Sequence, residues 1–298
     1  GVVEHELFFR LAMRLDTTGR PIRHGYYELP SGLSPLQILN HLQEGTQWRM
    51  PPGEVPDELK VTIPEGLTIV QMAAQFADPE AFGEAAADPQ LIARLGLDVP
   101  NLEGFLMPNT YYFEEKPDER AVVERLLSHF EHEYAELRKE LPETAERDLL
   151  EVVTVASLIE EECRVDEERP LVAAVIYNRL KAGMPLDLDS TLQYALGKYG
   201  ERILNEDKET DSPYNTYRRK GLPPGPISNP GVACLRAALQ PAEEDYLFFV
   251  SNADGKTHTF STTMNEHAEA VRRFRREIAV QRRELRDRET RGEENDAQ

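Results

Sequence analysis

The sequence predicts an α+β protein, in which a small α/β module at the N-terminal end precedes a larger domain of mixed helices and strands. Two observations support this prediction. The order strand–helix–strand–helix over the first part of the chain is typical of a small α/β module. Long helical patterns follow, and two strand patterns then lie on either side of a turn near residue 254. The 298 residues are enough for one large domain or two modest ones.

Five short segments predict the N-terminal module, which we place within residues 1–95. They are a helical or mixed segment, a strand, a helix, a strand and a second helix, at 7–15, 25–29, 35–45, 59–63 and from Thr68 onward. Ser34 is a suitable N-cap for the first helix because Pro35 follows it. Thr68 comes directly before the helical apolar pattern of the second helix.

The larger domain is expected to span residues 96–285. Its first segment, residues 102–113, surrounds turn formers with aromatic and apolar residues. The elements expected after it are helices at 121–140, 145–165 and 170–182, a turn-rich stretch at 205–231, strands at 246–250 and 258–260, and a charged helix from Asn265. Residues 286–298 are expected to form a disordered tail.

Composition and charge exclude several classes of function. Hydrophobic residues make up 40% and charged residues 30% of the chain, as in a soluble globular protein. The 54 acidic residues outnumber the 34 basic ones and give a net charge of −20, which disfavours binding to nucleic acid and adsorption to anionic lipid. The longest apolar runs are too short to cross a bilayer. The chain begins abruptly in what resembles folded sequence, so we expect a truncated start.

Cysteine and histidine patterns give no metal or cofactor site. Cys163 and Cys234 are too few for a disulfide framework, and two buried thiols are expected, with one long-range disulfide as the alternative. His258 and His267 lie on a predicted strand and a predicted helix without a third ligand at a recognisable spacing. We expect structural hydrogen bonds for both histidines, no metal and no cofactor.

One carboxylate interrupts the apolar face of a predicted helix. The positions on this face follow helical spacing and are Leu149, Val153, Ala156, Glu160 and Cys163. A buried carboxyl group favours its protonated form, which is the form that a general acid needs. A solvated helix end that carries the acidic run 160–162 explains the pattern equally well. Glu162 is a rival, because Val155, Leu158 and Val165 share its face.

An ordered set of motifs resembles the MltG/YceG-like family of peptidoglycan lytic transglycosylases. Residues 156–162 are similar to the family's Ala-Ser-apolar-apolar-Glu-x-Glu segment, whose first glutamate corresponds to Glu160. Further segments match in the same order, and together they cover roughly residues 100–270: 175–180, 184–194, 212–217, 221–227, 246–250 and 258–260. More loosely, residues 25–27 and 63–66 resemble the family's LysM-like subdomain.

The resemblance implies an endolytic enzyme that cuts the bond between MurNAc and GlcNAc without water. Glu160 would protonate the glycosidic oxygen, and the resulting carboxylate would take the proton of the MurNAc C6 hydroxyl. That oxygen would attack C1 and leave a 1,6-anhydroMurNAc end, which terminates glycan elongation. Because no water is activated, the second carboxylate of ordinary glycosidases is not required. The resemblance implies peptidoglycan glycan strands as the substrate and peptidoglycan synthases as candidate partners.

The same resemblance implies a place in the cell. The family normally begins with one membrane-spanning helix, which this chain lacks. The expected protein is therefore anchored once in the inner (cytoplasmic) membrane, with its catalytic part facing the periplasm or the extracytoplasmic space.

Candidate residues for the glycan groove have hydroxyl, amide, carboxylate and aromatic side chains, which suit a polyhydroxylated ligand. They are Asn178, Asp189, Thr191, Gln193, Tyr194, Tyr214, Asn215, Thr216 and Tyr217. Structural roles are expected beside this one or in its place. Asp189 would also cap a helix that begins near Thr191, Asn178 is alternatively a helix-surface amide, and Tyr214 and Tyr217 alternatively pack in a turn.

Two other functions remain open at this point. A muramidase would hydrolyse the same bond and would need a second acid near Glu160, for which Glu162 and Asp189 are the candidates. A non-catalytic peptidoglycan-binding scaffold would use the LysM-like module alone.

Overall fold

The computed structural model describes residues 38–39, 59–113 and 115–296, with side chains as far as residue 283. The chain divides into two compact units, one of Gly1–Val61 with Tyr112–Lys116 and one of Thr62–Tyr111 with Pro117–Gln298. The predicted boundary at residue 95 therefore falls within the second unit. Over the residues that the structure describes, no helix is long and apolar enough to cross a membrane.

Little of the first unit is described. Ile38 and Leu39 are helical and buried. The elements expected at 7–15 and 25–29, the cap at Ser34 and the match at 25–27 lie outside the described residues. The LysM-like reading of this module therefore stays a prediction.

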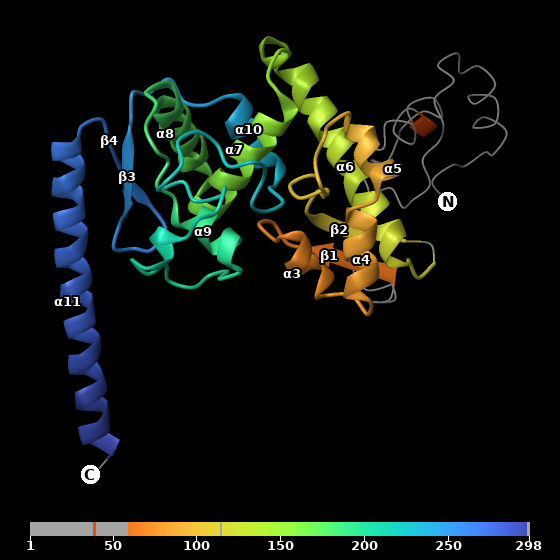
Figure 1. The fold of residues 1–298 in the computed structure, drawn as a ribbon. Coiled ribbons are helices and arrows are strands. Elements are labelled where there is room, and N and C mark those ends of the chain that lie inside the picture. The colour runs from red at the N-terminus through yellow and green to blue at the C-terminus, as the bar shows by residue number, and fades with distance from the viewer. Residues whose placement is uncertain (1–37, 40–58, 114, 297–298) are drawn as a thin grey trace. The chain divides into compact units, whose positions relative to one another are not determined.

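The second unit is mainly helical, and its helices appear in Figure 1 from orange to blue. In chain order they are α3 (Ile69–Ala73), α4 (Pro79–Ala86), α5 (Pro89–Ile92), α6 (Glu119–Glu140), α7 (Leu149–Glu162), α8 (Arg169–Lys181), α9 (Asp189–Leu196), α10 (Val232–Leu239) and α11 (Met264–Asp296). Side-chain caps fix several of their starts. Thr68 caps α3 in a capping box with Gln71, and Asp148 caps α7. The predicted helices at 121–140, 145–165 and 170–182 are confirmed as α6, α7 and α8.

Two small sheets complete the α+β fold. Strands β1 (Lys60–Ile63) and β2 (Asn109–Tyr112) pair with each other, and β3 (Phe248–Ser251) pairs antiparallel with β4 (His258–Ser261). The β3–β4 hairpin confirms the two strands and the turn predicted from the sequence. In Figure 1 the hairpin lies between the helices α7–α10 and the long helix α11.

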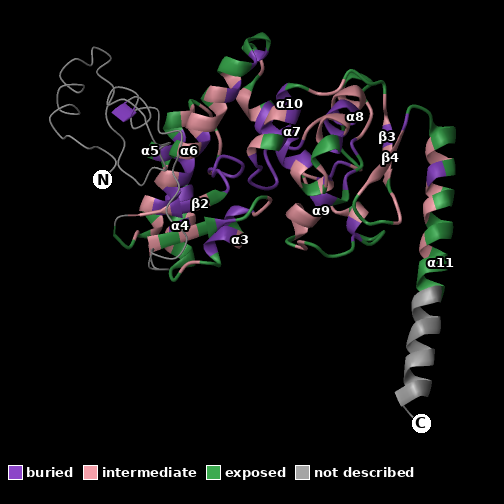
Figure 2. Ribbon diagram, turned by 180° about the vertical axis from the view of Figure 1, so that it is seen from behind, coloured by how far each residue is buried: buried purple, intermediate pink, exposed green. Residues whose placement is uncertain are grey.

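The helix α7 forms the centre of the core around the candidate site. All its residues from Val152 to Ile159 are buried, and Figure 2 draws this stretch in purple beside α10. A helix that is apolar on every side is typical of a protein interior. Its two ends reach solvent, and the last turn contains the acidic run 160–162. The buried and free thiols of Cys163 and Cys234 confirm the prediction for the cysteines.

The C-terminal region differs from the prediction. The helix α11 continues to Asp296, whereas the sequence predicts a disordered tail from residue 286. Arg and Glu dominate this segment and are good helix formers, so helical propensity accounts for the difference.

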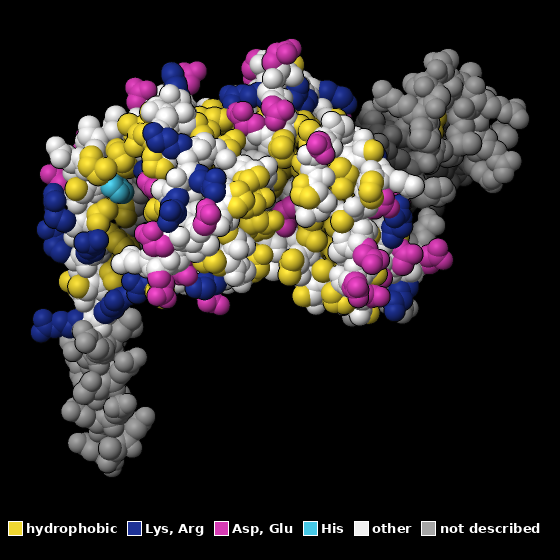
Figure 3. Space-filling model, in the orientation of Figure 1, with side chains coloured by type: hydrophobic (Ala, Val, Ile, Leu, Met, Phe, Trp, Pro, Cys, Tyr) yellow, Lys and Arg dark blue, Asp and Glu magenta, His cyan; other side chains and the backbone are white. Residues whose placement is uncertain are grey.

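Charge is distributed unevenly over the face seen in Figure 3. Asp and Glu side chains gather near α4, whereas Lys and Arg side chains are numerous over α8, α9 and α11. Acidic and basic side chains therefore gather in different regions of this face, although the whole chain has a net charge of −20.

Candidate active site

Glu160 lies at the end of α7, where the buried helix meets solvent. Its side chain is half-buried, and its Oε2 accepts a hydrogen bond of 2.9 Å from the backbone N–H of Gly231. Gly231 directly precedes α10, so this N–H belongs to the positive end of a helix dipole. The interaction stabilises a carboxylate at this position.

Two cationic or weakly acidic groups also face Glu160. The thiol of Cys234 on α10 hydrogen-bonds to it, and burial strongly raises the pKa of this thiol, which is therefore neutral. The guanidinium of Arg169 donates from Nε to the Cys234 Sγ at 3.1 Å and interacts electrostatically with Glu160. The carboxyl group is thus surrounded by donors from two elements.

The acidic residues next to Glu160 point to different partners. Glu162 accepts a hydrogen bond of 2.8 Å from the Ser190 hydroxyl and so ties α7 to α9. Burial raises the pKa of Glu162. Desolvation of the Glu161 carboxyl group raises its pKa to about 7, with a smaller rise from Glu160 and Glu162 and an opposing hydrogen bond from Ser228. Although Glu161 reaches the surface, its carboxyl group is therefore partly protonated near neutral pH.

A buried amide and a buried acid hold the loop that carries Gly231. Asn229 is fully buried, and its Oδ1 accepts from the N–H groups of Gly104 and Leu106, both at 2.9 Å. Its Nδ2 donates to Leu67 O at 2.9 Å and to Glu103 Oε1 at 2.8 Å. All four bonding positions of this amide are therefore used within the protein.

Glu103 is the deepest carboxyl group of this region, at 6% exposure. It accepts from the Ile69 N–H at 3.1 Å as well as from Asn229. Burial raises the pKa of Glu103 to about 8, and its hydrogen bonds from Ile69 and Asn229 oppose that rise. Glu103 was not among the predicted site residues. The signal that could have identified it is a carboxylate within the otherwise apolar segment 102–107.

A second carboxylate, Glu65, lies close to Glu160 and was also missed. It stands in the turn after β1, and a Cβ atom added to Gly231 would lie 2.0 Å from Glu65 Oε1. Desolvation raises the pKa of Glu65, the charge of Glu160 raises it further, and Arg169 opposes the rise. The sequence offers only the turn Pro64-Glu65-Gly66 as a signal, because Glu65 and Glu160 are far apart along the chain.

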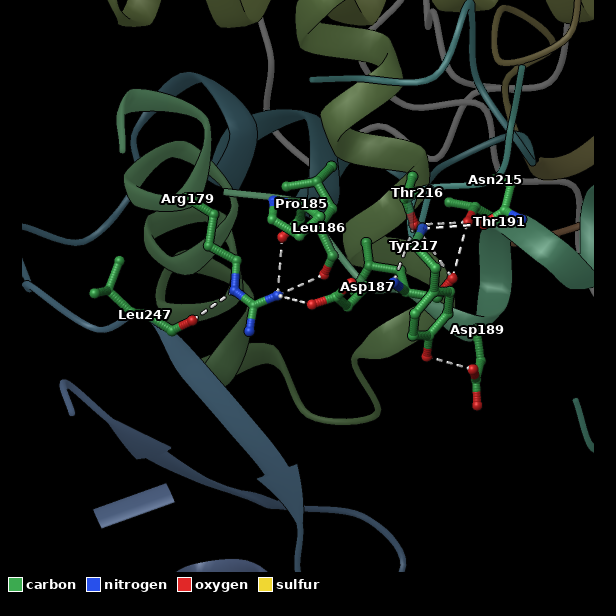
Figure 4. Close-up of polar contacts among 11 residues, drawn as sticks. Arg179, Pro185, Leu186, Asp187, Asp189, Thr191, Asn215, Thr216, Tyr217 and Leu247 are labelled. Atoms are coloured by element: carbon green, nitrogen blue, oxygen red, sulfur yellow. Dashed lines mark hydrogen bonds and ion pairs between the residues drawn. The ribbon is translucent and has the colours of Figure 1, made fainter. Parts of the chain in front are cut away.

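Four of the predicted groove residues form a cluster around the start of α9 (Figure 4). The hydroxyl oxygens of Thr191 and Thr216 lie 2.9 Å apart, and Thr216 Oγ1 accepts from the Leu188 N–H at 3.1 Å. The Tyr217 hydroxyl donates to Asp189 Oδ1 at 2.6 Å. Both threonines are buried, whereas the carboxylate of Asp189 is exposed.

The capping role predicted for Asp189 is wrong. The helix α9 begins at Asp189 itself, and Leu188 occupies the N-cap position without a side-chain hydrogen bond. The carboxylate is instead held by the Tyr217 hydroxyl, a contact between segments that local sequence does not predict.

Two further predicted residues make hydrogen bonds within the protein. Asn215 is buried, and its Nδ2 donates to the Lys208 and Thr210 carbonyls at 2.9 and 2.8 Å. The amide of Asn178 donates to the carbonyls of Glu244 and Tyr246 at 2.7 and 3.0 Å. In this structure these amides position segments of the chain, and a contact with glycan stays a prediction.

The remaining three predicted residues reach solvent. The rings of Tyr194 and Tyr214 lie 4.9 Å apart, and the Tyr194 hydroxyl faces Glu103 Oε2 at 3.5 Å. Gln193 donates from Nε2 to the Glu201 carbonyl at 2.6 Å. The two half-exposed tyrosine rings are therefore connected, through Glu103 and Asn229, to the loop that contacts Glu160.

The two histidines take structural positions. His258 confirms the expected hydrogen bonding, since its Nδ1 lies 2.7 Å from Glu168 Oε2. The expectation is wrong for the His267 side chain, whose Nδ1 has no hydrogen-bond partner among the described residues and whose ring stacks on Phe248 at 5.2 Å. Within the described residues, no group of three or more His, Cys, Asp and Glu side chains is arranged to hold a metal ion.

Comparisons with known proteins agree on one family. The model of the YceG-like family matches residues 1–273. The chain is 34% identical over 275 residues to an endolytic murein transglycosylase of Bacillus subtilis, which covers 84% of this chain and 72% of the relative. It is 29% identical over 301 residues to the endolytic murein transglycosylase of Streptococcus pneumoniae, which covers 90% of this chain and 53% of the relative.

A solved structure supports the same assignment. The crystal structure of a yceG-like protein from Listeria monocytogenes matches with a TM-score of 0.65 and 31% identity, over 90% of this chain and 91% of that chain. Because the family model covers nearly the whole sequence, the motif resemblance and the fold lead to one conclusion. The chain belongs to the YceG-like family.

Proposed function

We propose that this protein is an endolytic murein transglycosylase that cleaves the MurNAc–GlcNAc bond of nascent peptidoglycan with Glu160 as its single acid–base group. The observation that carries the proposal is the position of Glu160, at the C-terminal end of a buried helix, where it reaches solvent and lies against the N-terminus of α10. The names of the two bacterial relatives support the reaction and the substrate.

The proposed reaction uses the Glu160 carboxyl group twice, first as an acid and then as a base. Protonated Glu160 gives its proton to the glycosidic oxygen as the C1–O bond breaks, and positive charge develops on the MurNAc ring. The Glu160 carboxylate then takes the proton of the C6 hydroxyl, whose oxygen bonds to C1 and forms the 1,6-anhydro ring. The N–H of Gly231 favours the intermediate state, because it stabilises the carboxylate that exists between the two transfers.

The glycan is proposed to bind along residues that reach solvent near this group. Tyr194 and Tyr214 offer aromatic faces, and Gln193 and Asp189 offer polar groups. Asn178, Thr191, Asn215, Thr216 and Tyr217 are proposed to shape the groove, since their polar atoms bond within the protein.

Cell location and partners extend the proposal. We infer that the protein acts on the extracytoplasmic side of the inner membrane, tethered there by an anchor outside this chain. We also propose that the protein terminates glycan strands beside peptidoglycan synthases, with a LysM-like module within residues 1–95 and a catalytic domain at 96–285.

The test is release of soluble glycan fragments from purified sacculi by the wild type and by Glu160→Gln. General acid–base catalysis contributes about 10²–10⁴-fold in rate, so we expect a loss of that size in the variant. Glu151→Gln is the matched control, because Glu151 is exposed in the first turn of the same helix.

The variants Glu161→Gln and Glu162→Gln complete the experiment. Equal activity of Glu160→Gln and the wild type would remove Glu160 from the mechanism. A loss confined to one of the other two variants would move the acid–base role to that residue.

A further inference from the structure

The loop before α10 contacts the last two turns of α7 and ends at Glu160. The Ile227 N–H donates to Ser157 Oγ at 3.0 Å, and the Gly231 N–H donates to Glu160 Oε2 at 2.9 Å. Ser157 and Glu160 are three positions apart and therefore lie on the same side of α7. The loop thus extends from a buried hydroxyl group to the carboxyl group at which the glycan is proposed to react.

Gly231 is fixed on its C-terminal side by α10. Its carbonyl accepts from the N–H groups of Cys234 and Leu235 at 3.1 and 3.2 Å. Pro230 precedes Gly231, and the proline ring restricts φ to about −65°. The direction of the Gly231 N–H therefore depends on how the residue before the proline is held, and that residue is Asn229.

The backbone of Asn229 pairs with the turn that follows β1. Its N–H donates to the Leu67 carbonyl at 2.9 Å, and its carbonyl accepts from the Gly66 N–H at 3.0 Å. The side chain adds a bond of 2.9 Å from Nδ2 to the same Leu67 carbonyl. Three hydrogen bonds therefore hold Asn229 to a segment about 162 residues earlier in the chain.

The amide side chain of Asn229 extends this attachment into the core. Its Oδ1 accepts from the N–H groups of Gly104 and Leu106, both at 2.9 Å, and its Nδ2 donates to Glu103 Oε1 at 2.8 Å. Glu103 in turn accepts from the Ile69 N–H at the start of α3, at 3.1 Å. Because a buried amide is costly to leave unsatisfied, this set of bonds favours a single orientation of Asn229.

We propose that Asn229, held in place by Glu103, is a positioning residue that directs the Gly231 N–H toward the Glu160 carboxyl group. The proposal rests on the proposed function. In that reaction the Glu160 carboxylate exists between two proton transfers, and a donor already directed at it needs no reorganisation. Asn229 is fully buried and Glu103 nearly so, and neither touches the glycan. Both act through the N–H that contacts Glu160.

The experiment measures kcat and KM for cleavage of uncrosslinked peptidoglycan strands by the wild type, Asn229→Ala and Glu103→Leu. Both substitutions remove side-chain hydrogen bonds from Asn229. A misplacement of about 1 Å costs about 10²-fold in rate, so kcat of Asn229→Ala should fall by up to that factor. KM should not change, because the Gly231 N–H faces Glu160 and not the glycan.

The double variant tests whether Glu103 and Asn229 act together. Their side chains bond directly, and the proposal has Glu103 act through Asn229. The loss of kcat in the double variant should therefore equal the loss in Asn229→Ala, whereas losses that multiply would contradict this link. Should Asn229→Ala fail to fold, Glu103→Leu replaces it: its kcat should fall, and an unchanged kcat contradicts the proposal.

The NMR signal of the Gly231 amide gives a readout that a loss of stability alone does not change. A proton donated to a carboxylate resonates downfield, so the signal should move upfield in Asn229→Ala. Thr144→Val is the control, because it removes a buried hydrogen bond of 2.7 Å to the Leu141 carbonyl, between α6 and α7. This control should lower stability but leave kcat and the Gly231 signal unchanged.

The outcomes separate the two proposals. A wild type that releases no fragments overturns the proposed function and this inference with it. An active wild type whose kcat and Gly231 signal are unaltered in Asn229→Ala overturns the role of Asn229 alone. A rise in KM in place of the fall in kcat, or an equal fall of kcat in Thr144→Val, also overturns that role.

Discussion

Glu103 shows how one buried carboxyl group links stability to pH. Its pKa of about 8 in the folded protein exceeds the ordinary value of 4.5 because of burial. Between these values the folded state binds more protons than the unfolded state, so stability falls as pH rises. The stabilisation is complete below pH 4.5 and is lost as pH increases through 8.

We therefore predict that Glu103→Gln changes the pH dependence of unfolding. Glutamine keeps an oxygen for Ile69 and Asn229 but cannot ionise. Relative to the wild type, the variant should gain up to about 1.4 kcal/mol per pH unit in this window. Denaturant unfolding at several pH values measures this gain, with exposed Glu84→Gln as the control. Parallel curves for wild type and Glu103→Gln would contradict it.

Sequence reasoning at the residue scale proposed Glu160 but did not predict the groups that surround it. The helical stripe could not distinguish Glu160 from Glu162, because α7 is buried on every side and each face of it is apolar. Glu65, Glu103 and Asn229 meet only in the fold, through contacts between segments separated by much of the chain. Periodicity describes single helices and strands and therefore carries no information on such contacts.

At the scale of elements, Arg179 joins α8 to β3 and to the segment before α9 (Figure 4). Its Nε donates to the Leu247 carbonyl at 2.6 Å, and its Nη1 donates to the Pro185 and Leu186 carbonyls at 3.1 and 2.8 Å. Burial lowers the pKa of Arg179, against the effect of Asp187. The guanidinium group reaches all three carbonyls because its donor N–H groups point in different directions within one plane.

We predict that Arg179→Lys destabilises the protein by about 2 kcal/mol, because one ammonium group cannot reach carbonyls on both sides. Denaturant unfolding measures the change. Arg272→Lys is the control, since Arg272 is exposed on α11 and should stay within about 0.5 kcal/mol. Equal stability of Arg179→Lys and Arg272→Lys would show that the three carbonyls do not require a guanidinium group.

The existence and order of the long helices were the part of the fold that the sequence predicted best. Thr68 and the Pro at the start of α8 mark two helix starts locally, whereas α7 begins at Leu149, after the Asp148 cap, and not near residue 145. The turn-rich stretch 205–231 was recognised as irregular, but its arrangement around α7 was not. That arrangement depends on buried hydrogen bonds such as the one from the Ile227 N–H to Ser157 Oγ at 3.0 Å.

For the whole molecule, the central claim is that one acid cuts glycan without water. The position of Glu65 gives this claim a direct rival, because two neighbouring carboxyl groups are also the equipment of a hydrolase. The sequence proposed Glu162 or Asp189 for that second acid, but Glu162 bonds to Ser190 and Asp189 to Tyr217. Glu65 is the carboxylate that a hydrolytic mechanism would use.

The most direct test is mass spectrometry of the fragments that the wild type releases from sacculi in water enriched in oxygen-18. Transfer to the C6 hydroxyl predicts 1,6-anhydroMurNAc ends that contain no oxygen-18. Reducing MurNAc ends that carry one oxygen-18 atom at C1 would contradict the account, because they require water as the attacking group.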